Sequence, residues 1–218
     1  MNPRGGRLLV LLGMAISCLA VASYSEQAPS IRRASFTSPD GLFRFFYPSD
    51  FEVCTPGRIE PCIHSYIPAC DQDAIVCVVY PAKQFKETSF GAAAFEVREL
   101  RTDRETMTAD VCVTPYPSKS SAGVSEWPEY LISARQPAKV IGGVLFVHGI
   151  KVEGAMSHSS SVDLYRTFHG GRCFELSVSQ SGTDPHAFDP PKQGLTAQQQ
   201  KKVDGSMNQI VQSFRFIK

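Results

Sequence analysis

The stretch TAQQQKKVDGSMNQIVQS, residues 196–213, has the pattern of an amphipathic helix and does most to decide the fold class. Thr196 and Gln199 have the spacing of a capping box, in which each side chain bonds the backbone N–H of the other. Apolar residues recur every three or four positions and form one stripe, so we expect this stripe to pack on a sheet. The stripe consists of Val203, Met207, Ile210, Val211 and Phe214, and the expected exposed positions include Gln198, Lys202, Asp204 and Gln209.

Two Gly-Gly pairs upstream of the helix predict two β-hairpins, because glycine tolerates the positive φ angles of tight hairpin turns. The first pair separates residues 138–141 from 144–152, and the second separates residues 160–169 from 172–180. A two-residue turn in the second hairpin pairs Phe168 with Cys173, and it pairs Arg166 with Glu175, which have opposite charges. The same register predicts two apolar faces: one with Val162, Leu164 and Phe168, the other with Tyr165, Phe174, Leu176 and Val178.

Other strands are predicted at residues 34–37, 42–47, 75–80, 90–100 and 214–217 from their β-branched and aromatic residues. A short helix is expected within residues 106–113. The segments 50–73 and 114–137 are rich in proline, so we expect loops there.

Residues 36–48, FTSPDGLFRFFYP, and residues 210–216, IVQSFRF, resemble the two ends of the PsbP/Mog1-like fold and of the secreted bacterial families that share it. The resemblance implies an antiparallel sheet between helices and loops. It implies no activity, since members range from photosystem accessory proteins to a nuclear transport factor. We therefore expect an α+β domain, residues 34–218, with an antiparallel meander covered by the C-terminal helix and by disulfide-stapled loops. The cysteine-rich loop departs from the named members, so no functional residue is carried over.

The N-terminal segment has the three parts of an export signal. Arg4 and Arg7 are basic, residues 8–19 are apolar, and residues 20–22 provide a small-x-small cleavage site. The apolar run is too short for a comfortable membrane span. We expect residues 1–22 to be a cleaved signal peptide and residues 23–33 to be a flexible leader. An alternative is a lipobox at residues 15–18, in which Cys18 is lipidated and anchors the chain.

Six cysteines follow the signal, and export to an oxidising compartment favours disulfides over free thiols. Sequence alone does not choose the pairing. Short loops close easily, which favours Cys54–Cys62, Cys70–Cys77 and Cys112–Cys173. The C-x-x-C motif typical of zinc ribbons and of thioredoxin-like redox sites is absent from the sequence.

Charge excludes one class of partner. The signal holds two of the 22 basic residues and none of the 21 acidic ones, so the mature chain of about 196 residues carries a formal charge of −1. No basic run provides the field that attracts nucleic acid. We expect no nucleic-acid partner and no transmembrane span.

A serine hydrolase is the sharpest enzymatic alternative, because residues 157–163 contain Ser157, His158, Ser159 and Asp163. Neighbours on a strand point to opposite faces, however, and triads assemble from distant positions. The mature chain has neither G-x-S-x-G nor S-x-x-K.

Metal ligation has weak support. His148 shares a face with apolar neighbours, which indicates a core or rim position, and His64, His158, His169 and His186 lie apart in sequence. Asp71 and Asp73 lie before a buried strand without the remainder of a calcium-loop motif. We therefore expect no catalytic, cofactor-binding or metal-ligating residue.

These observations predict an exported protein of the periplasm, cell surface or extracellular space. We expect a disulfide-stabilised, non-catalytic binding or accessory module with an unknown protein or small-molecule partner. The alternative is a secreted hydrolase with its site around residues 157–163.

Overall fold

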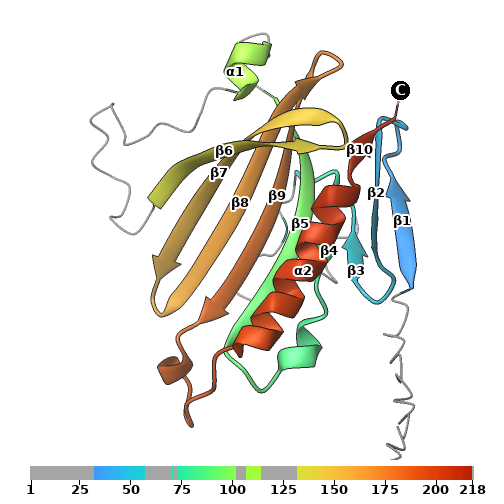
Figure 1. Cartoon of the computed structure of the whole chain (residues 1–218). Coiled ribbons are helices and arrows are strands. Elements are labelled where there is room, and N and C mark those ends of the chain that lie inside the picture. The colour runs from blue at the N-terminus through green and yellow to red at the C-terminus, as the bar shows by residue number, and fades with distance from the viewer. Residues whose placement is uncertain (1–31, 57–69, 71–72, 102–106, 114–131, 218) are drawn as a thin grey trace, which may run out of the picture. The chain divides into compact units, whose positions relative to one another are not determined.

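The computed structural model describes residues 32–56, 70, 73–101, 107–113 and 132–217 (Figure 1). Contacts between residues set 31–218 apart as one compact unit, and residues 1–30 lie outside the described ranges. The elements within this unit are β1 (Arg33–Thr37), β2 (Phe43–Pro48), β3 (Glu52–Cys54), β4 (Val76–Val79), η2 (Ala82–Phe85), β5 (Phe90–Leu100), α1 (Ala109–Val113), β6 (Ile132–Ile141), β7 (Val144–Ala155), β8 (His158–His169), β9 (Arg172–Thr183), η3 (Pro185–Ala187), α2 (Ala197–Ser213) and β10 (Arg215–Phe216).

The strands form two antiparallel sheets. The smaller sheet has the order β1-β2-β10, and the larger has the order β3-β4-β5-β9-β8-β7-β6. After β5 the chain passes through α1 to the far edge of the larger sheet and returns by the meander β6 to β9, which ends beside β5. The expected antiparallel strands and C-terminal helix are present. The strands do not follow one another as a continuous meander, because β1 and β2 form a sheet with the C-terminal strand β10, and β5 pairs with β9.

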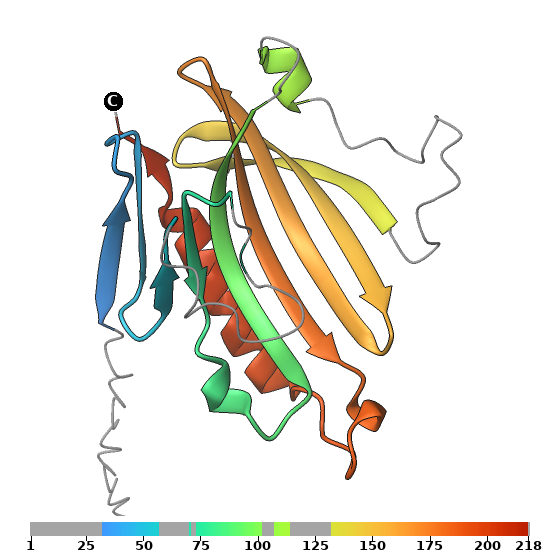
Figure 2. The same cartoon turned by 180° about the vertical axis from the view of Figure 1, so that it is seen from behind.

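Helix α2 has the predicted position and cap. The Thr196 hydroxyl accepts from the Gln199 N–H, and the Gln199 side chain accepts from the Thr196 N–H, as in a capping box. The expected stripe is buried, and the four positions expected to be exposed are exposed. The helix packs against β2 of the smaller sheet and β5 of the larger, and Figure 2 shows it on one face only of the larger sheet.

Aromatic side chains join the two sheets beneath α2. Phe45 of β2 contacts Phe95 of β5 edge to face, with 5.0 Å between ring centroids. Phe214, which caps the C-terminus of α2, lies 5.3 Å from Phe43, and Phe216 stacks 3.9 Å from the ring of His169. Because such contacts add to the area buried, the C-terminal residues fasten the smaller sheet to the larger one.

An ion-pair network joins the sheets at their surface. Arg172, at the start of β9, donates to Asp40 in the β1–β2 turn at 2.7 Å and also to Glu99 of β5. Ser38 donates to the same Asp40 carboxylate at 2.7 Å.

The hairpin predictions are confirmed, with longer strands than expected. Phe168 pairs with Cys173 and Arg166 pairs with Glu175, and the two predicted faces follow from this register. The loop expected over residues 114–137 is wrong from Ile132 onward, where β6 begins, and residues 114–131 lie outside the described ranges. The expected stapled loop at 50–73 contains β3, which pairs with β4.

Two predicted disulfides are present. Cys70 is bonded to Cys77, and Cys112 is bonded to Cys173, which ties α1 to the larger sheet. Cys54 is also disulfide-bonded, and its expected partner Cys62 lies outside the described residues.

Candidate functional site

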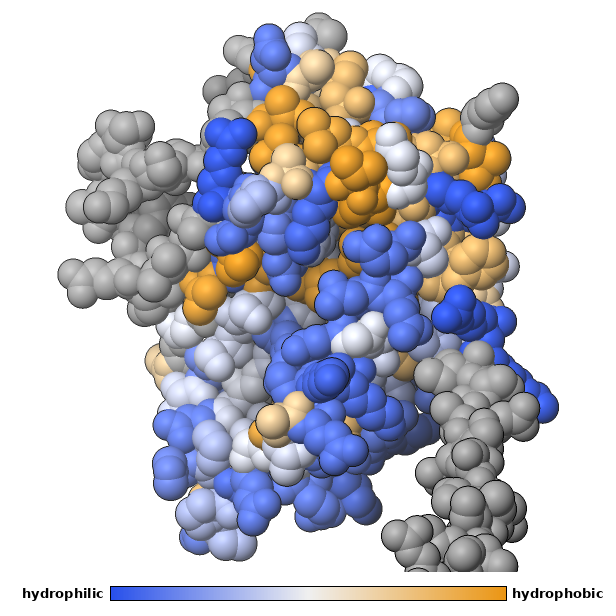
Figure 3. All heavy atoms as spheres, viewed as in Figure 1, coloured by the Kyte–Doolittle hydropathy of each residue, from blue (hydrophilic) through white to orange (hydrophobic). Residues whose placement is uncertain are grey.

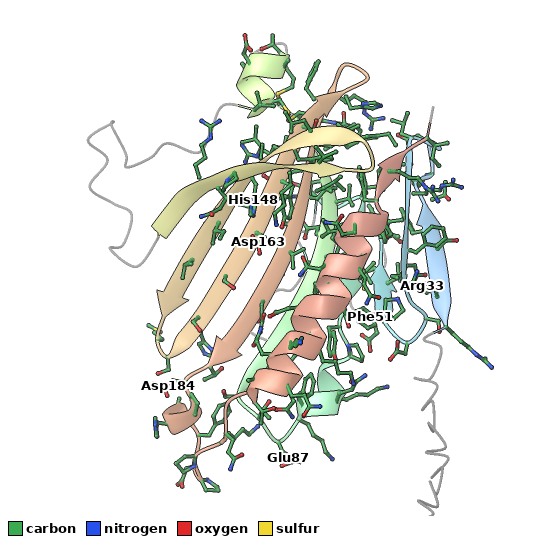
Figure 4. All side chains as sticks on the ribbon, in the orientation of Figure 1. Arg33, Phe51, Glu87, His148, Asp163 and Asp184 are labelled. Carbon is green, nitrogen blue, oxygen red and sulfur yellow. A yellow bond between two sulfur atoms is a disulfide. The ribbon has the colours of Figure 1, made fainter. Side chains whose placement is uncertain are left out.

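The larger sheet carries a polar cluster on the same face as α2. Strand pairing places His148 of β7 opposite Tyr165 of β8, and Tyr165 opposite Leu176 of β9, so all three share the face that meets the core. Asp163 lies two residues before Tyr165 on this face. Figure 4 shows His148 and Asp163 close together on β7 and β8, beside α2 and not beneath it. We call Gln136, Lys139, His148, Asp163 and Tyr165 the His148 cluster.

His148 is held on two sides. Its Nε2 lies 2.6 Å from Asp163 Oδ1, and its ring stacks on Tyr165 with centroids 4.5 Å apart and planes 11° apart. The other ring nitrogen, Nδ1, is buried and has no hydrogen-bond partner in the described part of the chain. Because the carboxylate accepts, Nε2 is the nitrogen that carries hydrogen. The Asp163 side chain is 41% exposed, whereas that of His148 is only 6% exposed.

A β-bulge in β6 brings Lys139 to the cluster. Gln136 pairs with His148 and Lys139 pairs with Phe146, so β6 has one residue more than β7 across this interval. Without the extra residue, Lys139 would point to the opposite face from Gln136. Pro137 lies within the bulge and on an edge strand, the position in a sheet that tolerates proline. Bulges commonly re-aim a side chain next to a functional site.

Lys139 extends over Tyr165. Its Nζ donates to Tyr165 Oη at 3.3 Å and lies 5.2 Å from the centre of the ring. Burial, with a smaller contribution from the nearby Asp163 charge, raises the pKa of the Tyr165 phenol. The phenol therefore keeps its hydrogen at neutral pH. Among the described residues, no ion pair joins Lys139 to Asp163.

A second charged cluster lies on the opposite face of the sheet. Glu175 has a fully buried side chain that accepts from Arg166 Nε at 2.6 Å and from Arg98. Arg98 also pairs with Glu96 at 3.1 Å. Two arginines and two glutamates compensate one another there, so the buried Glu175 charge is paired within the protein.

The proposed serine triad is not assembled. His158 Nδ1 pairs with Thr183 Oγ1 at 2.9 Å, and Asp163 is engaged by His148. Ser157 lies in the β7–β8 turn with a φ of 69°. Since His158 and Asp163 point to opposite faces of β8, the three residues do not converge.

The other histidines and aspartates considered as metal ligands also lie apart. His169 stacks on Phe216, His186 lies exposed in η3, and Asp73 precedes β4. His64 and Asp71 lie outside the described ranges. Within the described residues, no three histidine, cysteine, aspartate or glutamate side chains gather as a metal site.

Exposed apolar side chains collect elsewhere. Val140 and Leu145 form a cross-strand pair in the β6–β7 hairpin and are 64% and 63% exposed. Figure 3 shows hydrophobic residues where this hairpin meets β10, and hydrophilic residues over the outer side of α2.

Comparisons with known proteins give only distant matches. No family model and no curated protein sequence matches the chain. Among solved structures, the Ran-binding protein Mog1p of Saccharomyces cerevisiae has a TM-score of 0.44 at 10% identity, with 85% of this chain and 96% of that chain covered. LpqN of Mycobacterium tuberculosis, involved in cell envelope biogenesis, has a TM-score of 0.43 at 10% identity, with 87% and 92% covered.

The cyanobacterial PsbP of Synechocystis has a TM-score of 0.41 at 11% identity, with 86% of this chain and 94% of that chain covered. This chain spans about half, 48%, of a Bacteroides thetaiotaomicron protein that it matches with a TM-score of 0.41. The chain thus has a weak PsbP/Mog1-like fold resemblance. At this level of similarity we carry over no residue role.

Among the described residues, no helix is long and apolar enough to cross a bilayer.

Proposed function

We propose that the protein is an exported, disulfide-stabilised binding or accessory module without catalytic activity, and that the His148 cluster is its ligand-binding site. The observation that carries the proposal is the fixed Asp163 carboxylate, which is half-exposed while its partner His148 is buried. A buried donor that orients an exposed acceptor is the arrangement by which proteins prepare a polar group for a ligand.

The same geometry favours binding over catalysis. A general base must bring its free nitrogen within hydrogen-bonding reach of the substrate. Asp163 engages Nε2 of His148, and the other nitrogen, Nδ1, is buried, so neither is presented to a molecule on the face. The ring therefore acts as a support for Asp163.

A ligand screen tests this proposal. Small polar metabolites and short peptides would be screened by thermal shift against the mature chain, and the binders remeasured with Asp163→Asn. We expect at least one binder whose affinity falls with Asp163→Asn and is unchanged with Asp204→Asn, a control on the exposed side of α2. Fluorophosphonate labelling that depends on Ser157 or Ser159 would instead support the hydrolase and overturn the proposal.

Export is the other half of the proposal. It is supported by the disulfides Cys70–Cys77 and Cys112–Cys173, which are typical of oxidising compartments. Mass spectrometry of the native protein should find an N-terminus near Ser23. A diacylglyceryl group on Cys18 would favour the anchored form, and an intact Met1 on a cytosolic protein would refute export.

A further inference from the structure

Two opposite charges lie on one face of the sheet without neutralising each other. Lys139 comes from β6 and Asp163 from β8, and the stacked rings of Tyr165 and His148 lie between them. Surface charges on one protein face commonly find a counter-charge or remain mobile in water. These two instead contact ring side chains: Lys139 bonds the Tyr165 phenol, and Asp163 bonds the His148 imidazole.

Lys139 is positioned by the bulge and by Tyr165. The bulge turns the side chain to this face, and the phenol oxygen accepts one of its three N–H groups. The bond from Lys139 is the only hydrogen bond of Tyr165 Oη among the described residues. The Tyr165 side chain is buried, so its phenol serves to hold Lys139 in place.

Asp163 is positioned by His148. Only Oδ1 is used by the imidazole, and Oδ2 has no hydrogen-bond partner in the described part of the chain. The carboxylate thus presents one oxygen to a donor from solvent.

We propose that the His148 cluster binds a small zwitterion that carries one amine and one carboxylate. The ligand carboxylate accepts from Lys139 Nζ, and the ligand ammonium donates to Asp163 Oδ2. This inference rests on the proposed binding function and names its ligand class.

A zwitterion fits better than a single ion. A lone anion at Lys139 is repelled by Asp163, and a lone cation at Asp163 is repelled by Lys139. A molecule with both charges uses both side chains and adds no net charge to the site. Charge-assisted hydrogen bonds of this kind are stronger than neutral ones.

Calorimetric titration of the mature chain with glycine, 4-aminobutyrate and 6-aminohexanoate tests the proposal and measures the spacing of the two charges. We expect one member of the series to bind at least about tenfold more tightly than butylamine or butyrate. Lys139→Met and Asp163→Asn should each lower the affinity for that member by at least about tenfold. Lys201→Met and Asp204→Asn, on the exposed side of α2, should leave its affinity unchanged.

The comparison of zwitterions with single ions uses unaltered protein, so it stands even where a variant fails to fold. Equal affinity for butylamine or butyrate, or no binding by any member, overturns the zwitterion. If none of the three zwitterions binds while another compound binds in an Asp163-dependent manner, the proposed ligand class is wrong and the binding function holds. If no compound binds and the chain labels with fluorophosphonate, the binding function itself fails.

Discussion

Asp40 makes the stability of the contact between the two sheets depend on pH. Hydrogen bonds from Arg172 and, to a smaller degree, from Ser38 lower the pKa of its carboxyl from 3.8 to about 2. A lowered pKa in the folded state means that the charged form stabilises the fold. This stability is complete above about pH 4 and is lost as the pH falls through the folded pKa of about 2.

Asp40→Asn should therefore be less stable than the wild type at pH 6 and should lose this difference toward pH 2. The side chain is 45% exposed, so we expect about 1 kcal/mol or less at pH 6. Urea unfolding at several pH values measures the difference, with Glu87→Gln, an exposed carboxylate, as control. A difference that persists unchanged to pH 2 would show that the charge of Asp40 is not its cause.

Among the elements, α2 provides the main test of core packing. Ile210 is fully buried on the stripe, so Ile210→Ala should lower the free energy of unfolding by about 2–5 kcal/mol. Lys201 is exposed on the same helix, and Lys201→Ala should change it by no more than about 0.5 kcal/mol. Equal losses in thermal or urea unfolding would mean that the stripe is not docked.

The β6–β7 turn gives a second test at this scale. A Cβ on Gly142 would lie 2.4 Å from the Phe214 carbonyl oxygen and 2.9 Å from Arg215 Cα, whereas Gly143 has open space around it. Both residues have a positive φ, which costs about 1–2 kcal/mol for alanine. Gly142→Ala should thus be clearly more destabilising than Gly143→Ala in urea unfolding. Similar losses would show that the turn does not pack on β10.

The elements also differ in how far sequence predicts them. The capping box and the Gly-Gly turns are local signals, so α2 and the β8–β9 register could be predicted. The β7–β8 turn uses Met156 and Ser157 at φ angles of 48° and 69°, without glycine to mark it. The sequence therefore does not predict the register of β7 against β8. The contact between His148 and Asp163 depends on this register, so it is not predicted either. The bulge that re-aims Lys139 lies in a proline-containing stretch that reads as a loop.

For the whole molecule, the disulfides stabilise the folded state by reducing the conformational entropy of the unfolded chain. Cys112 and Cys173 are 61 positions apart, and Cys70 and Cys77 are 7 apart. Loop-closure entropy then predicts losses of about 4 and about 2 kcal/mol when each pair is removed. Urea unfolding of the two double Cys→Ala variants measures this order. The reverse order would mean that loop-closure entropy does not determine the two losses.

The position of β9 beside β5 has a consequence for a chain made from its N-terminus. Strand β5 is complete at Leu100, but its partner β9 does not begin until Arg172. In the interval the edge of β5 is open, and it carries the apolar run Ala92–Phe95. Open apolar edges recruit other strands. Chains that stop before Arg172 should therefore aggregate in a sedimentation assay, and the full-length chain should not.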